Sequence, residues 1–490
     1  MMAGQSMVAS HDQNFIDGRW IRPASVERIQ VVCPSTEEII GEVPAAGQSD
    51  VDRAVGAARA AFAHGDWRNF SHDERSTVLE RAFRILDAGV DDLAQLVTAQ
   101  MGLPITAAAR QVPDSLARGR WFVEQAGALP RSEIRQGRVV AAVVREPVGV
   151  VAAIAPWNSP FNSILMKSVP ALAAGCSIVY KPAPESPLDA FHVTEALRQA
   201  GVPDGVFNLV TGGRETGQTL VAHPEVDKVS FTGSTAAGRE IGAVCGRNFT
   251  RVQLELGGKS AAIVLEDADL NVTIPQLVIG GFANSGQICS ALTRILIPTH
   301  RYREVADALV AETAKLHVGN PFDPATTTGP LVSRRQRDIV EGFIASGLSE
   351  GAKLLAGGGR PRDQERGWFV QPTIFGSADN SMRICREEIF GPVVALVPYH
   401  TLEEAIAIAN DSDYGLHGAV FTQDPVAALH VAQSVQTGTF SVNAFAYNTE
   451  APFGGVKASG IGRDTGREGV EAYFELKTIN LDPGTHSLLA

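Results

Sequence analysis

Residues 148–182 read VGVVAAIAPWNSPFNSILMKSVPALAAGCSIVYKP, in which two short apolar runs enclose a helical pattern. The runs are VGVVAAIAP (148–156) and SIVYKP (177–182), and the segment SILMKSVPALAAG between them has apolar residues at helical spacing and ends in glycine. Continuous apolar strands separated by helices are typical of parallel sheets whose two faces are covered. This stretch therefore predicts a βαβ unit, and with it an α/β fold.

The same alternation continues along the chain. Further runs of the first series are GVFNLVTG (205–212) and DKVSFTG (227–233), and a second series that begins near SAAIVLEDADL (260–270) predicts a second α/β domain. Residues 131–147 alternate like an exposed hairpin, and YFELKTINL (473–481) is its candidate partner strand. Because exposed strand edges require partners, our hypothesis for this pair is strand addition between subunits.

Composition narrows the class of protein. A chain of 490 residues with 44% hydrophobic and 20% charged residues predicts a folded protein of two or three domains. The net charge of −12 and the lack of a basic stripe argue against nucleic acid as a partner. No signal peptide is visible and the apolar runs are too short to span a bilayer, so no membrane association is expected. Five scattered cysteines without CxxC or Cys/His pairing predict neither disulfides nor a metal site, and they favour a cytoplasmic location.

Several polar residues occupy positions that suit chemistry. Cys289, in NSGQICSALTR (284–294), is a candidate nucleophile, although unpaired cysteines are usually buried and inert and no histidine lies nearby in sequence. Glu255, in the apolar string VQLEL, is a candidate general base, because burial raises a carboxyl pKa; the alternative is the wet face of a strand. Asn158, in PWNSPF, is a candidate oxyanion donor or a helix cap.

Two further positions suit a phosphate-bearing ligand. Lys181 ends a predicted parallel strand, where such sheets bind ligands, but a surface lysine is the simpler explanation. Ser234, in FTGSTAAG, opens a helix whose N–H groups suit a phosphate, although the turn is neither a G-x-G-x-x-G motif nor a P-loop. Taken singly, each of these residues is explained as well or better by a structural role.

In order along the chain, however, the motifs resemble one family. The sequence resembles the NAD(P)-dependent aldehyde dehydrogenases from about residue 14 to 479, and the spacing of Glu255 and Cys289 is that of the hydrolytic branch, which does not acylate CoA. The motifs that carry the resemblance are PWNSPF, KPAPESP, FTGSTAAGREI, LELGGKS, GQIC, EEIFGPV and PFGGVKASGIGR.

The resemblance implies a three-part subunit that forms a homodimer or homotetramer. We expect a Rossmann-type nucleotide-binding domain (1–127 and 148–256), an α/β catalytic domain (257–455) and bridging segments with a small β-hairpin (128–147 and 456–490).

The resemblance also implies a mechanism. Cys289 would attack the aldehyde as a thiolate, and the Asn158 side chain and the Cys289 N–H would hold the oxyanion of the thiohemiacetal. Hydride transfer to the nicotinamide would leave a thioester, and Glu255 would activate the water that releases the acid. The implied cofactor residues are Trp157, Lys181, Gly233, Ser234, Glu388 and Phe390.

The loop after Lys181 departs from the pattern of many NAD-preferring members. Where these carry a carboxylate that repels a 2′-phosphate, this sequence has Pro184, and the acid Glu185 follows one residue later. Without that repulsion, discrimination against NADP weakens. We expect NAD as the cofactor, with substantial tolerance of NADP.

The substrate channel is the least defined part. The resemblance places these residues along it: Ser159, Ser163, Met166, Ile288, Ser290 and Phe445. Small residues in these segments favour a roomy, largely apolar channel for a medium or bulky aldehyde, and the absence of arginine and lysine there disfavours semialdehyde acids.

Three alternatives stay open. A CoA-acylating semialdehyde dehydrogenase is disfavoured by Glu255, which that branch usually lacks. A non-catalytic structural member of the family is disfavoured because both Cys289 and Glu255 are present. A thiol hydrolase is the third alternative, because a thioester-forming cysteine can also cleave esters.

Overall fold

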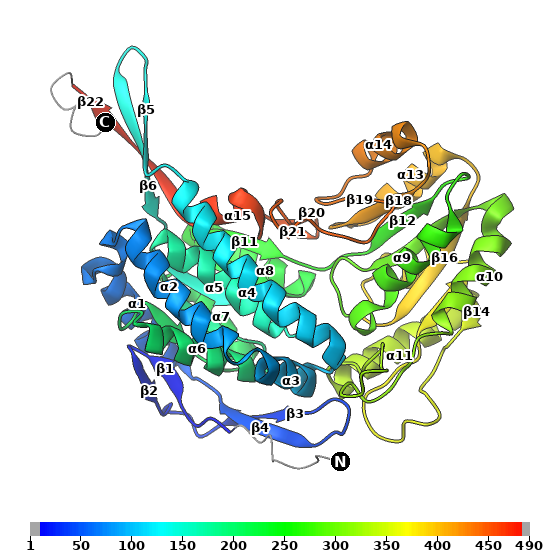
Figure 1. Ribbon diagram of the computed structural model, residues 1–490, viewed down its shortest axis with the longest axis horizontal. Coiled ribbons are helices and arrows are strands. Elements are labelled where there is room, and N and C mark those ends of the chain that lie inside the picture. Colours follow the sequence, from blue (N-terminus) through cyan, green and yellow to red (C-terminus); the bar gives the residue numbers. More distant parts are fainter. Residues whose placement is uncertain (1–9, 483–490) are drawn as a thin grey trace.

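The computed structural model describes residues 10–482 of the chain. Two lobes, each built on its own large sheet, lie side by side, and a narrow three-stranded sheet projects near the C-terminal end (Figure 1). Helices cover both large sheets, so the structure is of the predicted α/β class. None of the helices in the described range is long and apolar enough to cross a lipid bilayer.

The first large sheet has eight strands, of which the five central ones run parallel. In their order across the sheet the strands are β2 (Arg19–Ile21), β1 (Asn14–Ile16), β9 (Phe207–Leu209), β8 (Ser177–Lys181), β7 (Val150–Ile154), β10 (Lys228–Thr232), β11 (Arg251–Glu255) and β21 (Gly460–Ile461). The apolar runs of the first series thus form β7 to β10, which confirms the predicted βαβ series.

Helices cover this sheet on both faces. The helices of this lobe are α1 (Gln48–His64), α2 (His72–Asp87), α3 (Val90–Met101), α4 (Ile105–Ala128), α5 (Pro160–Ala174), α6 (Leu188–Ala200), α7 (Arg214–Ala222), α8 (Thr235–Asn248) and α15 (Gly466–Glu471). Alternate residues of β7 enter different cores: Val151 and Ala153 pack with α2 to α6, whereas Val150 and Ala152 pack with α1 and α7. Burial on both faces explains why β7 is apolar throughout.

The second large sheet has seven strands. In spatial order they are β14 (Lys353–Ala356), β15 (Thr373–Gly376), β16 (Val393–Tyr399), β13 (Leu292–Pro298), β12 (Ser260–Val264), β18 (Gly418–Phe421) and β19 (Ser441–Val442). All except β14 are parallel to their neighbours. Its helices are α9 (Leu270–Phe282), α10 (Tyr302–Thr313), α11 (Arg334–Ser349), α12 (Arg383–Arg386), α13 (Leu402–Asn410) and α14 (Pro425–Ser434). The second alternating series therefore forms a second α/β unit, as predicted.

The projecting sheet contains the hairpin expected at residues 131–147. Strand β22 (Phe474–Leu481) pairs antiparallel with β6 (Val140–Pro147), which also pairs with β5 (Ser132–Arg135). The predicted partner strand is therefore correct, but it comes from the same chain and not from a second subunit.

Short strands connect the C-terminal segment to other parts of the molecule. Strand β20 (Val456–Lys457) pairs with β17 (Tyr414–Gly415), and β21 joins the first large sheet through β11. Near the N-terminus, β3 (Arg28–Val32) and β4 (Ile39–Pro44) form a separate hairpin. The division into domains at 1–127 with 148–256, 257–455, and 128–147 with 456–490 stays a prediction.

Candidate active site

A cavity of about 780 Å³ is lined by residues of both lobes. From the first lobe it takes the ends of β7, β8 and β10, which is the edge where parallel sheets bind ligands. From the second lobe it takes the loop of Cys289 and the segment 388–390. The predicted residues that line it are Trp157, Asn158, Lys181, Pro184, Gly233, Ser234, Cys289, Glu388 and Phe390.

Cys289 lies in the loop between a short 3₁₀ turn (Ala283–Gly286) and β13. Within that turn Asn284 and Ser285 have φ angles of 50° and 56°. Residues other than glycine adopt this backbone conformation only at a cost in free energy. The turn is held by Ser285 Oγ, which donates to the carbonyl oxygen of Gly329 at 2.8 Å, and by Gln287, whose Oε1 accepts from the N–H of Val332 at 2.9 Å. These bonds fix the loop that presents the thiol to the cavity.

Asn158 reaches the same loop from the end of β7. Its Nδ2 donates to the carbonyl oxygen of Gln287 at 2.9 Å, and Asn284 Nδ2 donates back to the carbonyl oxygen of Asn158 at 3.1 Å. The amide of Asn158 is therefore hydrogen-bonded to the loop two residues before Cys289, and both residues line the same cavity. The sequence motifs did not single out Asn284 or Gln287, which hold this arrangement.

The glycines of LELGGKS allow two loops to approach closely. A Cβ on Gly258 would overlap the backbone carbonyl oxygen of Cys289, and a Cβ on Gly257 would overlap the carboxylate of Glu388. The N–H of Gly258 donates to Glu388 Oε1 at 3.0 Å. Two glycines in sequence thus bring together the segments of Glu255, Cys289 and Glu388.

Glu255 ends β11 and is only 3% exposed. Burial raises the pKa of its carboxyl well above the ordinary value, and the nearby negative charge of Asp464 raises it further, whereas Lys167 and Arg463 act in the opposite direction. Its Oε1 is buried and has no hydrogen-bond partner among residues 10–482. A carboxyl of this kind is a strong base once it loses its proton.

A buried ion pair lies beside Glu255. Lys167 Nζ is 3.5 Å from Asp464 Oδ2 and donates to Ser230 Oγ at 3.2 Å, and both charged side chains are almost completely buried. The sequence motifs did not single out this pair. Lys167 is the one charged residue of the buried helix α5, and that feature could have identified it from the sequence.

The surroundings of Cys289 favour the neutral thiol. Burial raises its pKa well above the ordinary value, and the negative charges of Glu255 and Glu388 raise it further. Of the two routes to a thiolate, a lowered pKa or proton acceptance by a base, the site therefore offers the second.

Several residues of the cavity suit a dinucleotide. Ser234 caps α8, with its Oγ accepting from the N–H of Ala237 at 3.3 Å, so the helix begins at the cavity wall. Lys181 is buried, its Nζ donates to the carbonyl oxygen of Pro182 at 3.0 Å, and burial lowers its pKa to about 8. The rings of Trp157 and Phe390 meet edge to face with centroids 5.1 Å apart.

The loop after Lys181 is partly buried. Burial raises the pKa of Glu185, and the positive charges of Lys181 and Arg335 oppose that rise. Arg335 lines the cavity, as do Arg214 and Glu240, whose exposed side chains form an ion pair at 2.8 Å. None of these three residues was singled out from the sequence.

Aromatic side chains gather beside the nucleophile. Tyr447 donates its hydroxyl to Ser290 Oγ at 2.6 Å, and its ring packs on Phe445 with centroids 5.4 Å apart. Ser290 is buried and Ile288 is half-buried. His417 packs against both aromatic rings, and burial lowers its pKa to about 4, so it is neutral.

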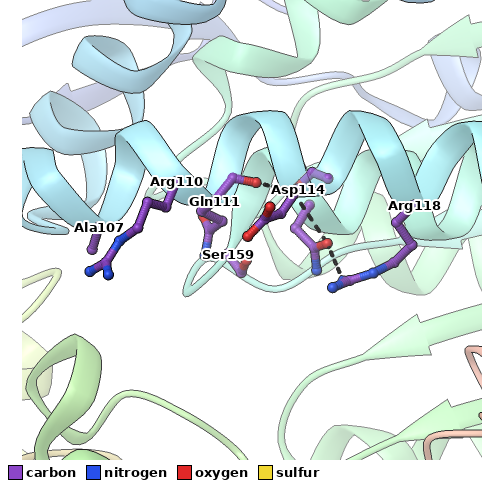
Figure 2. A pocket seen from close by; sticks show the side chains of 8 residues that line it. Ala107, Arg110, Gln111, Asp114, Arg118 and Ser159 are labelled. Carbon is purple, nitrogen blue, oxygen red and sulfur yellow. Dashed lines mark hydrogen bonds between the residues drawn. The ribbon is translucent and has the colours of Figure 1, made fainter. Parts of the chain in front are cut away.

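The three substrate residues predicted after Asn158 differ in their surroundings. Ser159 lines a second, polar cavity formed with α4 (Figure 2). Met166 packs against the main core with its sulfur 3.7 Å from Arg118 of that cavity, whereas Ser163 is buried in the helix. Arg110 and Arg118 also line this polar cavity. The surroundings of Ser159 are therefore more polar than the largely apolar channel expected from the sequence.

Comparisons with known proteins agree with this geometry. The model of the aldehyde dehydrogenase family matches residues 20–479. Geranial dehydrogenase from Castellaniella defragrans is 45% identical over 97% of this chain and 100% of its own. The 3-succinoylsemialdehyde-pyridine dehydrogenase of a Pseudomonas species is 42% identical over 95% of this chain and 97% of its own.

Solved structures show the same fold. An aldehyde dehydrogenase of Mycobacterium tuberculosis in complex with NAD+ superposes with a TM-score of 0.95 at 46% identity, covering 97% of this chain and 99% of that one. A mutant aldehyde dehydrogenase of Pseudomonas syringae in complex with NAD+ and octanal gives a TM-score of 0.92 at 41% identity, covering 96% of each chain. The predicted family and fold are confirmed: the chain belongs to the aldehyde dehydrogenase family.

Proposed function

We propose that the protein oxidises a medium or bulky aldehyde to the carboxylic acid, with NAD as the hydride acceptor. The observation that carries this proposal is the meeting of Cys289 and Asn158 at one cavity, with the Asn158 amide bonded to the Gln287 carbonyl oxygen at 2.9 Å. A thiol beside an amide donor suits addition to a carbonyl group, because the donor stabilises the oxyanion that forms.

The large cavity fits the proposed cofactor. The backbone N–H groups at the start of α8, beside Gly233 and Ser234, favour a pyrophosphate. We assign Lys181 to the adenine ribose and Glu388 to the nicotinamide ribose, with Trp157 and Phe390 as the adjoining walls. NAD+ bound in solved structures at 46% and 41% identity supports NAD as the ligand of this cavity.

In the first half of the proposed reaction, Cys289 adds to the aldehyde carbon while Glu255, the buried base whose charge acts on the thiol, accepts its proton. The Asn158 amide and the Cys289 backbone N–H then stabilise the oxyanion of the thiohemiacetal. NAD, when bound, accepts the hydride, and the acyl group stays on Cys289 as a thioester.

In the second half, water must attack the thioester. Glu255 first passes the thiol proton to solvent and then removes a proton from that water, and its raised pKa makes it a stronger base than an exposed glutamate. The positive charges of Lys167 and Arg463 oppose the rise of its pKa and so favour the ionised carboxylate. The acid then leaves, and Glu255 returns the proton to the sulfur of Cys289, which restores the thiol.

Cofactor preference depends on the loop after Lys181. Pro184 carries no charge, and the positive charges of Lys181 and Arg335 act on Glu185, the next residue along the loop. We therefore propose that NADP is also accepted. Initial rates with NADP at millimolar concentration test this, and a complete absence of turnover would contradict it.

The substrate proposal rests on the surroundings of the thiol. Phe445 and Tyr447 provide aromatic surface beside Ser290 and the half-buried Ile288. One relative is named for geranial, and a mutant of another was crystallised with octanal, and both of these aldehydes have an apolar chain of medium length. An apolar body of medium length therefore suits the site.

The subunit has a surface suited to self-association. Strands β22 and β5 are both edges of the projecting sheet, and Leu476 and Ile479 on β22 are 62% and 36% exposed. Exposed strand edges and exposed apolar side chains favour a partner, so we propose a homodimer or homotetramer. Light scattering of the purified protein tests this, and a monomer at micromolar concentration would contradict it. We also propose that the protein is located in the cytoplasm.

A panel of aldehydes, followed through NADH absorbance, tests the proposed activity. Wild-type protein should oxidise medium or bulky aldehydes, and Cys289→Ala should lose all turnover. NAD binding by Cys289→Ala, measured by calorimetry, shows that this variant is folded. Normal turnover by Cys289→Ala would overturn the mechanism.

A further inference from the structure

One face of α4 and the start of α5 line an open polar cavity of about 280 Å³ (Figure 2). Each α4 residue that lines it lies three or four positions from another one, which places them on one side of the helix. The residues that matter here are Arg110, Gln111, Asp114 and Arg118 of α4, and Ser159 and Asn162 at the start of α5. The proposed reaction uses none of these side chains.

The polar cavity begins next to the reacting centre. Ser159 lines it, and the preceding residue, Asn158, lines the large cavity together with Cys289. Asn158 is the proposed donor to the aldehyde oxygen. The part of a substrate that points towards α5 therefore comes close to the polar face of α4.

Arg118 has an incomplete set of partners. Its Nη1 donates to Asn162 Oδ1 at 2.6 Å and lies 3.7 Å from the sulfur of Met166. Within residues 10–482 its Nε is buried without a hydrogen-bond acceptor, and no carboxylate is within ion-pairing distance. Gln111 Oε1, in the same cavity, is likewise buried and without a donor in that range.

Arg120, two residues further along α4, differs from Arg118 because its guanidinium is paired with carboxylates. It forms ion pairs with Glu80 at 3.1 Å and with Asp87 at 2.5 Å. Because a buried donor without an acceptor costs free energy, the unpartnered Nε of Arg118 indicates a ligand group that completes the partners of this guanidinium.

We propose that Arg118 binds an oxygen acceptor on the substrate, so that the preferred aldehydes carry a carboxylate or carbonyl oxygen away from the reacting end. This inference rests on the proposed function and narrows its substrate class. A guanidinium suits both groups, because its planar fork donates to oxygen and its charge attracts a carboxylate. With Arg110 and Arg118 against Asp114, the charged side chains of the cavity are positive on balance.

The inferred substrate has an apolar part and a part that carries an oxygen acceptor. The aromatic rings of Phe445 and Tyr447 contact its apolar body near the thiol, and α4 binds its oxygen. The sequence-based expectation against acidic aldehydes considered only the segments around Cys289 and along α5. Arg110 and Arg118 lie on α4, which was not among those segments.

Three matched aldehydes test the proposal: a straight-chain aldehyde, its analogue with a terminal carboxylate, and its analogue with a carbonyl oxygen in the chain. For wild-type protein we expect kcat/KM to be about 10-fold to 100-fold higher for at least one oxygen-bearing analogue, as for a hydrogen bond to a charged group. In Arg118→Met that ratio should fall towards one, mainly through KM. A larger ratio for the carboxylate identifies charge as the recognised feature, and a larger ratio for the carbonyl identifies hydrogen bonding.

The ratio separates binding from a structural role of Arg118. If Arg118 only holds α5 through Asn162, its replacement changes the rates for all three aldehydes together and leaves the ratio intact, which would overturn the proposal. Arg120→Met is the matched control and should keep the wild-type ratio. A wild-type ratio near one, with the straight-chain aldehyde oxidised normally, would overturn this inference alone. Failure of all three aldehydes to reduce NAD would overturn the proposed function as well.

Discussion

Lys167 and Asp464 form a buried ion pair, with Nζ 3.5 Å from Oδ2, and the two charges act in opposite directions on the carboxyl of Glu255. The lysine lowers the pKa of Glu255 and the aspartate raises it. Burial is the largest cause of the raised pKa, and the pair adjusts it further, although neither residue contacts the substrate in the proposed reaction.

Replacing the two members of this pair should shift the pH profile of thioester hydrolysis in opposite directions. Hydrolysis requires ionised Glu255, so its rate rises with pH through the pKa of that carboxyl. Lys167→Met removes an attracting charge and should move the midpoint to higher pH. Asp464→Asn removes a repelling charge and should move it to lower pH. Rapid mixing, with the acyl-enzyme formed first and then exposed to a range of pH values, measures both midpoints.

Both variants also lose part of a buried ion pair, which typically lowers the free energy of unfolding by about 3–5 kcal/mol. Denaturant titration measures this loss separately from the kinetics. Midpoints that moved in the same direction in the two variants would contradict the electrostatic role, because a loss of stability alone gives no opposite signs.

Replacing Glu255 itself should slow thioester hydrolysis much more than thioester formation. In Glu255→Gln, general base catalysis of hydrolysis is lost, so steady-state turnover should fall by about 10²-fold to 10⁴-fold. Because a thiol is far more acidic than water, it depends less on the base, and a burst of NADH of about one equivalent per site remains. Stopped-flow absorbance shows the burst. Steady-state turnover at the wild-type rate would exclude Glu255 as the base in hydrolysis.

The sequence predicted the fold well where the pattern is local. Strands β7 and β8 are recognisable because each is a continuous apolar run whose neighbouring helix ends in glycine. The partner of β6 was also found, because an exposed alternating strand requires one. The sequence could not show that the partner strand, β22, comes from the same chain, because the same pattern would be expected for a strand from a second subunit.

The site was predictable only where motifs identify the family. Cys289, Glu255 and Asn158 come from three separate loops, and no periodicity relates them. Lys167 was detectable in principle, as a single charge in a buried apolar helix. Arg118 was not, because on an amphipathic helix such as α4 a binding arginine looks the same in sequence as a solvent-exposed one.

Asp189 should make stability depend on pH. Burial raises its pKa to about 7, despite a hydrogen bond donated by Gln100 Nε2 at 3.0 Å. In the unfolded chain the carboxyl ionises near pH 4, so between about pH 4 and about pH 7 the unfolded state releases the proton and the folded state keeps it. The free energy of unfolding should therefore fall as pH rises through this window, by an amount on the order of a few kcal/mol.

Asp189→Asn removes the titrating group and keeps an acceptor for Gln100. Melting temperatures measured at a series of pH values should fall less steeply for this variant than for the wild type. Parallel profiles for the two proteins would show that Asp189 does not carry the effect.

The close approach of Gly258 to Cys289 predicts a strong steric effect of a single methyl group. In Gly258→Ala the new Cβ would overlap the backbone carbonyl oxygen of Cys289, so the nucleophile loop must move. Displacing a nucleophile by even about 1 Å can lower kcat about 10²-fold, because the reacting atoms lose their alignment. Gly246→Ala in α8 is the matched control, since its Cβ meets nothing within 4 Å. There we expect normal kinetics and a gain in stability of up to about 1 kcal/mol from helix propensity. Equal kcat values for the two variants would show that the loop tolerates displacement and that the glycine is not required for positioning Cys289.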